Sequence, residues 1–160
     1  MPLQTISESL ARSVIGDAWH GPALGELLAD LTDAEAAAHP IAGAHSIVEI
    51  VRHLTAWVEE VTSRLEGHAP ALPASGDWPA ARPWPGIRDR LADVHERLQR
   101  ALAALPESQL VEVVGDLCDP PTGTGVTIET MLISLAEHHA YHGGQVALLK
   151  RALRPKPDRS

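Results

Sequence analysis

The chain has 160 residues, 44% of them hydrophobic, which suffices for one domain with a buried core and excludes a chain disordered by composition. Its net charge of −8 argues against nucleic acid as a partner, because phosphate binding requires clustered Lys and Arg. Its apolar runs are too short for a membrane span, its first residues do not resemble a secretory signal, and its single cysteine, Cys118, suits a reducing compartment, so the sequence predicts a cytoplasmic protein.

The first half of the chain predicts two helices. Residues 5–14 are only weakly amphipathic. A helix is predicted over 22–31, because proline suits its first position and the leucines that follow keep helical spacing. A longer helix is predicted over 46–66, where Ser46 and Glu49 form a capping-box pattern ahead of apolar residues with helical periodicity.

The second half predicts a long connection and two more helices. Residues 67–86 contain five prolines, three glycines and two tryptophans, which indicates a crossover loop. Helices are predicted over 87–105 and 127–151, and residues 152–160 form a flexible tail. Since no β-pattern of any length is present, the sequence predicts a single all-α domain over residues 1–160. This domain is a four-helix bundle with its long crossover between the second and third helices.

Histidines occupy core-facing positions in two of the predicted helices. In the last helix, His138, His142 and Gln145 continue a stripe of apolar residues that a bundle helix turns inward. Imidazoles four residues apart lie one turn apart on the same face and can bind one metal ion. A second stripe places His139 beside His142, so spacing alone allows the pair 139/142 as well. His53, in the middle of the helix over 46–66, is a third candidate ligand.

Several stretches of the sequence resemble the DinB/YfiT-like superfamily. Residues 138–146 resemble its HxxYHxGQ(I/V) signature, and residues 45–54 together with Trp57 resemble its HSIxEIVxHLxxW stretch. Residues 19–24 and the loop tryptophan Trp78 also match the family. The resemblance spans nearly the whole chain, and it implies a bundle with a long crossover after the second helix, often assembled as a homodimer.

The resemblance also implies a metal site. Matched position by position, it makes His53, His138 and His142 the ligands of a divalent ion: zinc, nickel, iron or manganese. His139 then falls where the family often has an acidic residue, and its role stays open. Characterised relatives include transferases and isomerases that use bacillithiol, mycothiol or glutathione, whereas many members have no known reaction, and a shared fold alone does not establish one.

Further residues are expected around this site. Gln145 is expected to hydrogen-bond the backbone or a ligating imidazole, with exposure to solvent as the alternative. Three tryptophans are expected to wall the entrance, namely Trp19, Trp57 and Trp78, although Trp57 is equally compatible with a role as core filler. Glu49 is the one clear acidic residue near the core-facing stripes.

The sequence leaves several functions open. Three neutral imidazoles leave coordination positions free, as in catalytic zinc sites, and a coordinated low-molecular-weight thiol becomes a nucleophile, so one candidate is a thiol-dependent S-transferase acting on a small molecule. A metal-dependent hydrolase would use water with a lowered pKa instead. The lack of a clear acidic general base other than Glu49 slightly favours the thiol over water, and the sequence does not decide between them. A non-catalytic, stress-associated metal-binding dimer is a further alternative. The remaining one is a bundle with polar core histidines and no metal.

Overall fold

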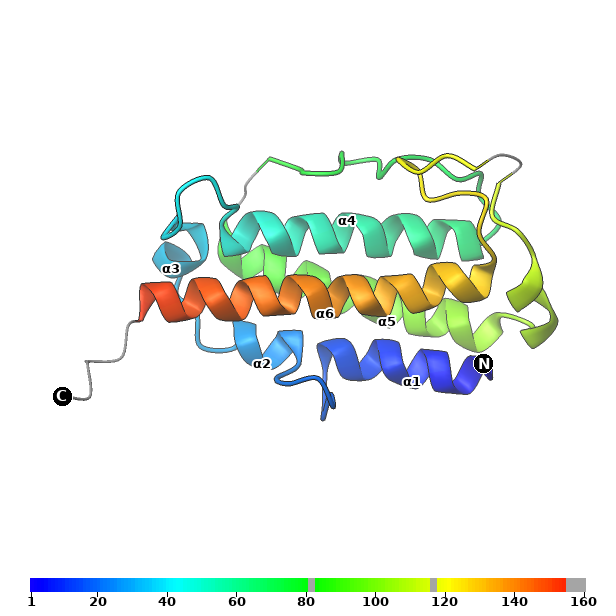
Figure 1. Cartoon of the computed structure of the whole chain (residues 1–160), viewed down its shortest axis with the longest axis horizontal. Helices are drawn as coiled ribbons and strands as arrows, with labels where there is room; N and C mark the ends of the chain where they lie inside the picture. The colour runs from blue at the N-terminus through cyan, green and yellow to red at the C-terminus, as the bar shows by residue number, and fades with distance from the viewer. Residues whose placement is uncertain (81–82, 116–117, 155–160) are drawn as a thin grey trace.

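The computed structural model describes residues 1–80, 83–115 and 118–154 of the chain (Figure 1). These residues form six α-helices and one short 3-10 helix, η1 (Glu107–Val111). Within the described ranges there is no β-strand, only an isolated bridge between Val113 and Thr127. The all-α fold predicted from the sequence is therefore confirmed.

Four long helices lie side by side in the structure (Figure 1). They are α1 (Leu3–Val14), α4 (Ile47–Leu65), α5 (Trp84–Ala104) and α6 (Ile128–Leu153). Helix α4 packs on α5 and α6, and α1 also contacts both α5 and α6, so the four helices surround a common interior. Each helix buries an apolar stripe there, which is the arrangement that helical periodicity of apolar residues favours.

The amino-terminal part differs from the prediction. The helix predicted over 22–31 is reduced to α2 (Leu24–Leu28), which is followed at once by a second short helix, α3 (Asp33–Ala37). Thr32 and Glu35 form a capping box that starts α3 in a new direction. The weakly amphipathic segment around residues 5–14 instead forms the long helix α1, because packing against α5 and α6 stabilises it beyond its own propensity.

Side-chain caps define where α4 and α6 begin. At the start of α4, the Ser46 hydroxyl accepts a hydrogen bond from the Glu49 backbone N–H, and a Glu49 carboxylate oxygen accepts one from the Ser46 backbone N–H at 2.7 Å. At the start of α6, the Thr127 hydroxyl accepts a hydrogen bond from the backbone N–H of Thr130 at 3.1 Å. These caps anchor the helices that carry the histidines.

The crossover after α4, described over residues 66–80, follows α4 along its length (Figure 1). Helix α5 begins earlier than predicted, at Trp84, since Pro85 is tolerated in its first turn. A buried ion pair between Glu60 and Arg64 of α4 secures the loop. Glu60 accepts a hydrogen bond from the Ala71 backbone N–H at 2.8 Å, and Arg64 donates to the Ala71 carbonyl at 3.0 Å. The loop is thereby attached to α4.

The carboxyl-terminal helix runs slightly further than predicted. Helix α6 ends at Leu153, and residues 155–160 of the predicted tail lie outside the described residues. Among the helices of the described ranges, none combines the length and apolar character that crossing a membrane would require.

Candidate metal site

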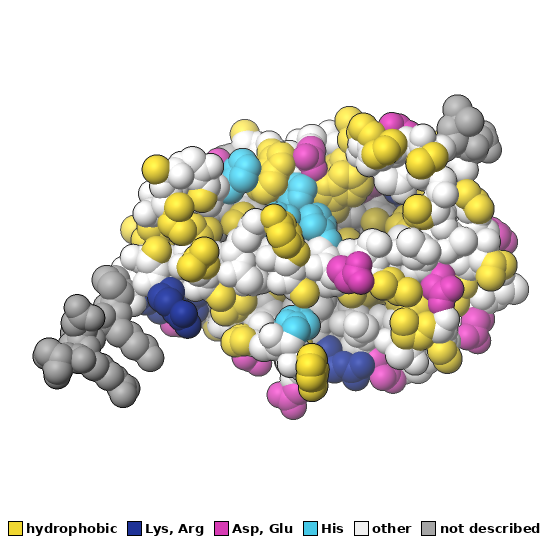
Figure 2. All heavy atoms as spheres, in the orientation of Figure 1, with side chains coloured by type: hydrophobic (Ala, Val, Ile, Leu, Met, Phe, Trp, Pro, Cys, Tyr) yellow, Lys and Arg dark blue, Asp and Glu magenta, His cyan; other side chains and the backbone are white. Residues whose placement is uncertain are grey.

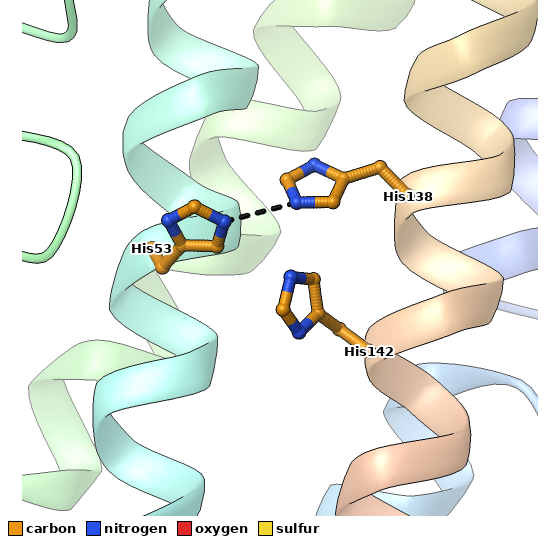
Figure 3. Close-up of side chains that lie close together, drawn as sticks. All are labelled: His53, His138 and His142. Carbon is orange, nitrogen blue, oxygen red and sulfur yellow. Dashed lines mark hydrogen bonds between the residues drawn. The ribbon is translucent and has the colours of Figure 1, made fainter. Parts of the chain in front are cut away.

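Three histidines from two adjacent helices converge in the structure (Figure 3). His53 projects from α4, while His138 and His142 project from α6 one turn apart, and their rings point toward one another. One ring nitrogen of each residue lies within 4.8 Å of the corresponding nitrogens of the other two. The Nε2 atoms of His53 and His138 are 2.9 Å apart. Spacing allowed either His138 or His139 to pair with His142, and the structure places His138 and His142 beside His53.

Hydrogen bonds orient two of the three rings. The Nδ1 atom of His53 lies 2.7 Å from the backbone carbonyl oxygen of Asp77, and that of His142 lies 2.7 Å from the side-chain oxygen of Gln145. Because these oxygens only accept, both Nδ1 atoms carry the proton and both Nε2 atoms keep a lone pair. In metalloproteins, hydrogen-bond acceptors beside ligating histidines likewise hold the proton on the outer ring nitrogen and leave the inner one free to bind the metal. Gln145 thus bonds a ring of this cluster rather than solvent.

Burial keeps the histidines of α6 neutral. Burial, with smaller contributions from the neighbouring His142 and His53, lowers the pKa of His138 to about 4. Burial also lowers the pKa of His142. Only neutral imidazole binds a metal ion, so both rings are in the ligating form near neutral pH.

The crossover covers His53. Trp78 stacks on the His53 ring with centroids 4.1 Å apart, and it also stacks on His45 at 3.6 Å. The indole N–H of Trp57 donates to the Asp77 carboxylate at 2.7 Å, while that same carboxylate oxygen lies 3.2 Å from Nδ1 of His53. Asp77 therefore joins Trp57 to the ligand cluster. Sequence reasoning did not single out Asp77, because a loop without periodicity carries no signal of where its side chains point.

Two residues predicted at the site lie elsewhere. Trp19 is fully exposed and lines a different pocket, between α1 and α6. It belongs to the α1–α2 connection, on the opposite side of α6 from the crossover, so it does not wall the cluster (Figure 1). Glu49 serves the cap of α4, with one carboxylate oxygen 3.0 Å from Nε2 of His39, and the backbone hydrogen bond from Ser46 lowers its pKa.

His139 faces away from the three-histidine cluster. Its Nε2 atom lies 3.3 Å from Nε2 of His95 on α5, and its Nδ1 atom lies 3.3 Å from the Ser13 hydroxyl on α1. Burial holds the pKa of His139 well below its usual value and lowers that of His95 to about 4. We call His139 and His95, together with Ser13, the core histidine group. The sequence feature that could have indicated this group is that His95 directly follows Val94, a residue of the apolar stripe of α5.

A cavity of about 440 Å³ opens beside the three histidines. His53 and His138 line one end of it, and apolar side chains from α4, α6 and the 119–127 segment line the rest, chiefly Val61, Val126, Met131 and Leu135. Figure 2 shows histidine side chains reaching the surface on this face next to hydrophobic ones. A ligand that reaches the three histidines therefore has an adjacent cavity to fill.

The fold and the cluster together define an all-helical protein with a three-histidine site that fits a metal ion. The family model of the DinB superfamily matches residues 18–146, so the chain belongs to the DinB superfamily. The fold is similar to that in the crystal structure of a conserved protein from Enterococcus faecalis, with a TM-score of 0.71, 22% identity, and coverage of 96% of this chain and 97% of that chain. A search of curated proteins finds no match. The family inferred from sequence resemblance is confirmed.

Proposed function

We propose that this protein is a divalent-metal-dependent enzyme in which His53, His138 and His142 hold the ion. The observation that carries this proposal is the convergence of three ring nitrogens within 4.8 Å, with the outer nitrogens of two rings bound by acceptors. Such neutral nitrogen donors suit zinc, nickel, iron or manganese. A divalent ion bound there would supply Lewis acidity, which lowers the pKa of a thiol or water that reaches it.

We propose S-transfer from a low-molecular-weight thiol to an electrophilic small molecule as the reaction. In it, a sulfur–carbon bond forms, the leaving group departs with the electron pair of the bond that breaks, and the thiol proton passes to solvent. The carboxylate nearest to the cluster, Asp77, already orients His53, and Glu49 is held in a helix cap. This arrangement favours a nucleophile that needs no strong protein base, as a thiol with a lowered pKa does.

Hydrolysis is the second candidate, and one observation favours it. The side chain of Asp77 is 47% exposed beside His53, so its carboxylate is accessible to solvent. In this reaction Asp77 would accept the proton of the attacking water. As for the setting of either reaction, we propose a cytoplasmic homodimer that acts on a small molecule and binds neither nucleic acid nor membrane. The exposed free thiol of Cys118, the net charge of −8 and the family resemblance support this setting.

Metal analysis with matched variants tests the proposal. We expect about one equivalent of metal in the purified protein and its loss in His142→Ala, whereas His20→Ala, which changes an exposed histidine far from the cluster in sequence, keeps it. The metal-loaded protein is then assayed with a chromogenic aryl halide plus a thiol, and separately with an activated ester. Turnover that needs both metal and thiol supports S-transfer, and ester cleavage without thiol supports hydrolysis. Tight binding of metal without either activity indicates a non-catalytic, stress-associated metal-binding dimer, and absence of metal binding refutes the proposal.

A further inference from the structure

The cavity beside the three histidines has a chemical character of its own. Its apolar lining is contributed by Val61 of α4, by Met131 and Leu135 of α6, and by Val126 of the segment before α6. Apart from histidine, two charged side chains among the described residues line it, Arg64 and Asp77. What these two charges bind decides which ligands the cavity accepts.

Most of the Arg64 guanidinium is engaged by the protein. Its side chain is only 4% exposed, and its Nε atom donates to Glu60 at 2.9 Å. One terminal nitrogen donates to the carbonyl oxygens of Ala71 at 3.0 Å and Thr122 at 2.7 Å. The positive charge is thus paired with Glu60, and this terminal nitrogen is used by two loops, while the other terminal nitrogen lies 3.8 Å from the sulfur of Met131. Arg64 therefore does not compensate an anion inside the cavity.

Asp77 gives the histidine end of the cavity a negative charge. Its carboxylate accepts the indole N–H of Trp57 at 2.7 Å and lies 3.2 Å from Nδ1 of His53. An anionic group brought beside it would be repelled, and burying an uncompensated charge is costly. In the apolar part of the cavity, away from the three histidines, a carboxylate or phosphate would have no unpaired cation of the described residues beside it, because Arg64 is paired with Glu60.

We infer that the substrate places an uncharged, apolar group, alkyl or aryl, in this cavity. This inference rests on the proposed function, because it assumes that the reacting atom of the substrate lies at the three histidines. The volume of about 440 Å³ is ample for such a group, since a cavity of roughly 150 Å³ already holds benzene. Apolar lining with few polar groups is the usual composition of small-molecule pockets.

A homologous series of thiols tests this inference with two separate readouts. Ethanethiol, butanethiol and hexanethiol are compared with 6-mercaptohexanoate, in which a carboxylate replaces the terminal methyl group of hexanethiol. The cobalt-loaded protein reports thiol binding at the three histidines through its absorption spectrum. Protein labelled with ¹³C in the methionine methyl groups reports cavity occupancy with or without metal, because the chain has two methionines and Met131 lines the cavity while Met1 does not.

We expect affinity to rise about fourfold per methylene at most, the value for full burial, and to fall at least tenfold when the carboxylate replaces the terminal methyl group. The Met131 signal should shift with hexanethiol while that of Met1 stays in place. Ser134→Trp adds bulk at an exposed position of the cavity wall and should abolish the dependence on chain length, whereas Arg151→Trp, at an exposed position near the end of α6, should preserve it.

The outcomes separate the two proposals. Failure to bind cobalt at the three histidines refutes the proposed function. Binding of cobalt and ethanethiol without any dependence on chain length, or equal affinity for 6-mercaptohexanoate, overturns the inference about the cavity. A Met131 signal that never responds in the wild-type protein overturns it too, whether or not Ser134→Trp folds.

Discussion

Adjacent residues of α6 should have opposite effects when each is replaced by alanine. His138 belongs to the three-histidine cluster and His139 to the core histidine group, although one peptide bond joins them. His138→Ala should abolish tight metal binding and leave the stability of the metal-free protein nearly unchanged. His139→Ala should destabilise the protein and leave metal binding nearly unchanged, because the three proposed ligands stay in place while a buried polar contact between helices is lost.

The magnitudes follow from the two environments. His139 is 1% exposed, so its truncation leaves a cavity and also leaves Nε2 of His95 without its partner 3.3 Å away. An unsatisfied buried polar group costs about 1–3 kcal/mol, and the cavity adds to this, for a total of about 2–4 kcal/mol. For His138, the loss of one of three nitrogen donors should weaken metal binding by more than about 100-fold, beyond the usual effect of a supporting residue.

Urea denaturation of the metal-free proteins and chelator competition for zinc measure the two quantities. His95→Leu/His139→Leu is the matched control, since removing both partners leaves no unpaired imidazole and should be less destabilising than His139→Ala. If His139→Ala loses metal as strongly as His138→Ala while its free energy of unfolding stays unchanged, then His139 is a ligand and the assignment of the two clusters is wrong.

Further predictions concern pH, the crossover and the buried ion pair. Because burial lowers the pKa of His95 to about 4, the unfolded chain binds more protons than the folded one below about pH 6.5. The free energy of unfolding of the metal-free protein should therefore fall by up to about 3 kcal/mol from this group as pH drops from about 6.5 toward 4. In urea denaturation, His95→Leu/His139→Leu should flatten this dependence on pH. Asp77→Ala should weaken zinc binding about 10- to 100-fold by chelator competition, with Asp93→Ala on α5 as the control; unchanged affinity would show that the Asp77 side chain does not orient His53. Arg64→Met should lower the free energy of unfolding by about 3–5 kcal/mol because it leaves Glu60 buried without its partner. Glu60→Gln/Arg64→Met should recover much of that loss in thermal unfolding. An Arg64→Met variant as stable as wild type would contradict this prediction.

The helices with strong local signals were predictable from the sequence, and those shaped by packing were not. The capping box at Ser46 and an uninterrupted apolar stripe predicted α4 to within a residue at each end. Helix α1 has no side-chain cap at its start and its buried apolar stripe is short, with Ile6, Leu10 and Val14, so its contacts with α5 and α6 decide its place among the long helices. The leucines of 22–31 keep helical spacing, but the capping box at Thr32 ends that run early.

The site shows the same division. Helix α6 is covered on several sides, by α1, α2 and α4, so apolar residues surround much of it and periodicity alone could not choose between His138 and His139. The family resemblance made that choice. The supporting contact of Gln145 was foreseeable because it lies one turn from its partner, His142. The contact of Asp77 was not, because it depends on the path of a proline-rich loop.

The ligands of the proposed metal site are far apart along the chain, and this affects how long the protein survives. His53 and His138 are separated by 85 residues, so in the unfolded chain their meeting is opposed by the entropy of closing a long loop. An ion would therefore bind the folded state much more tightly than the unfolded one and would stabilise it by mass action. Metal supply would then control the fraction of molecules exposed to proteases, so the amount of this protein would follow the availability of its ion.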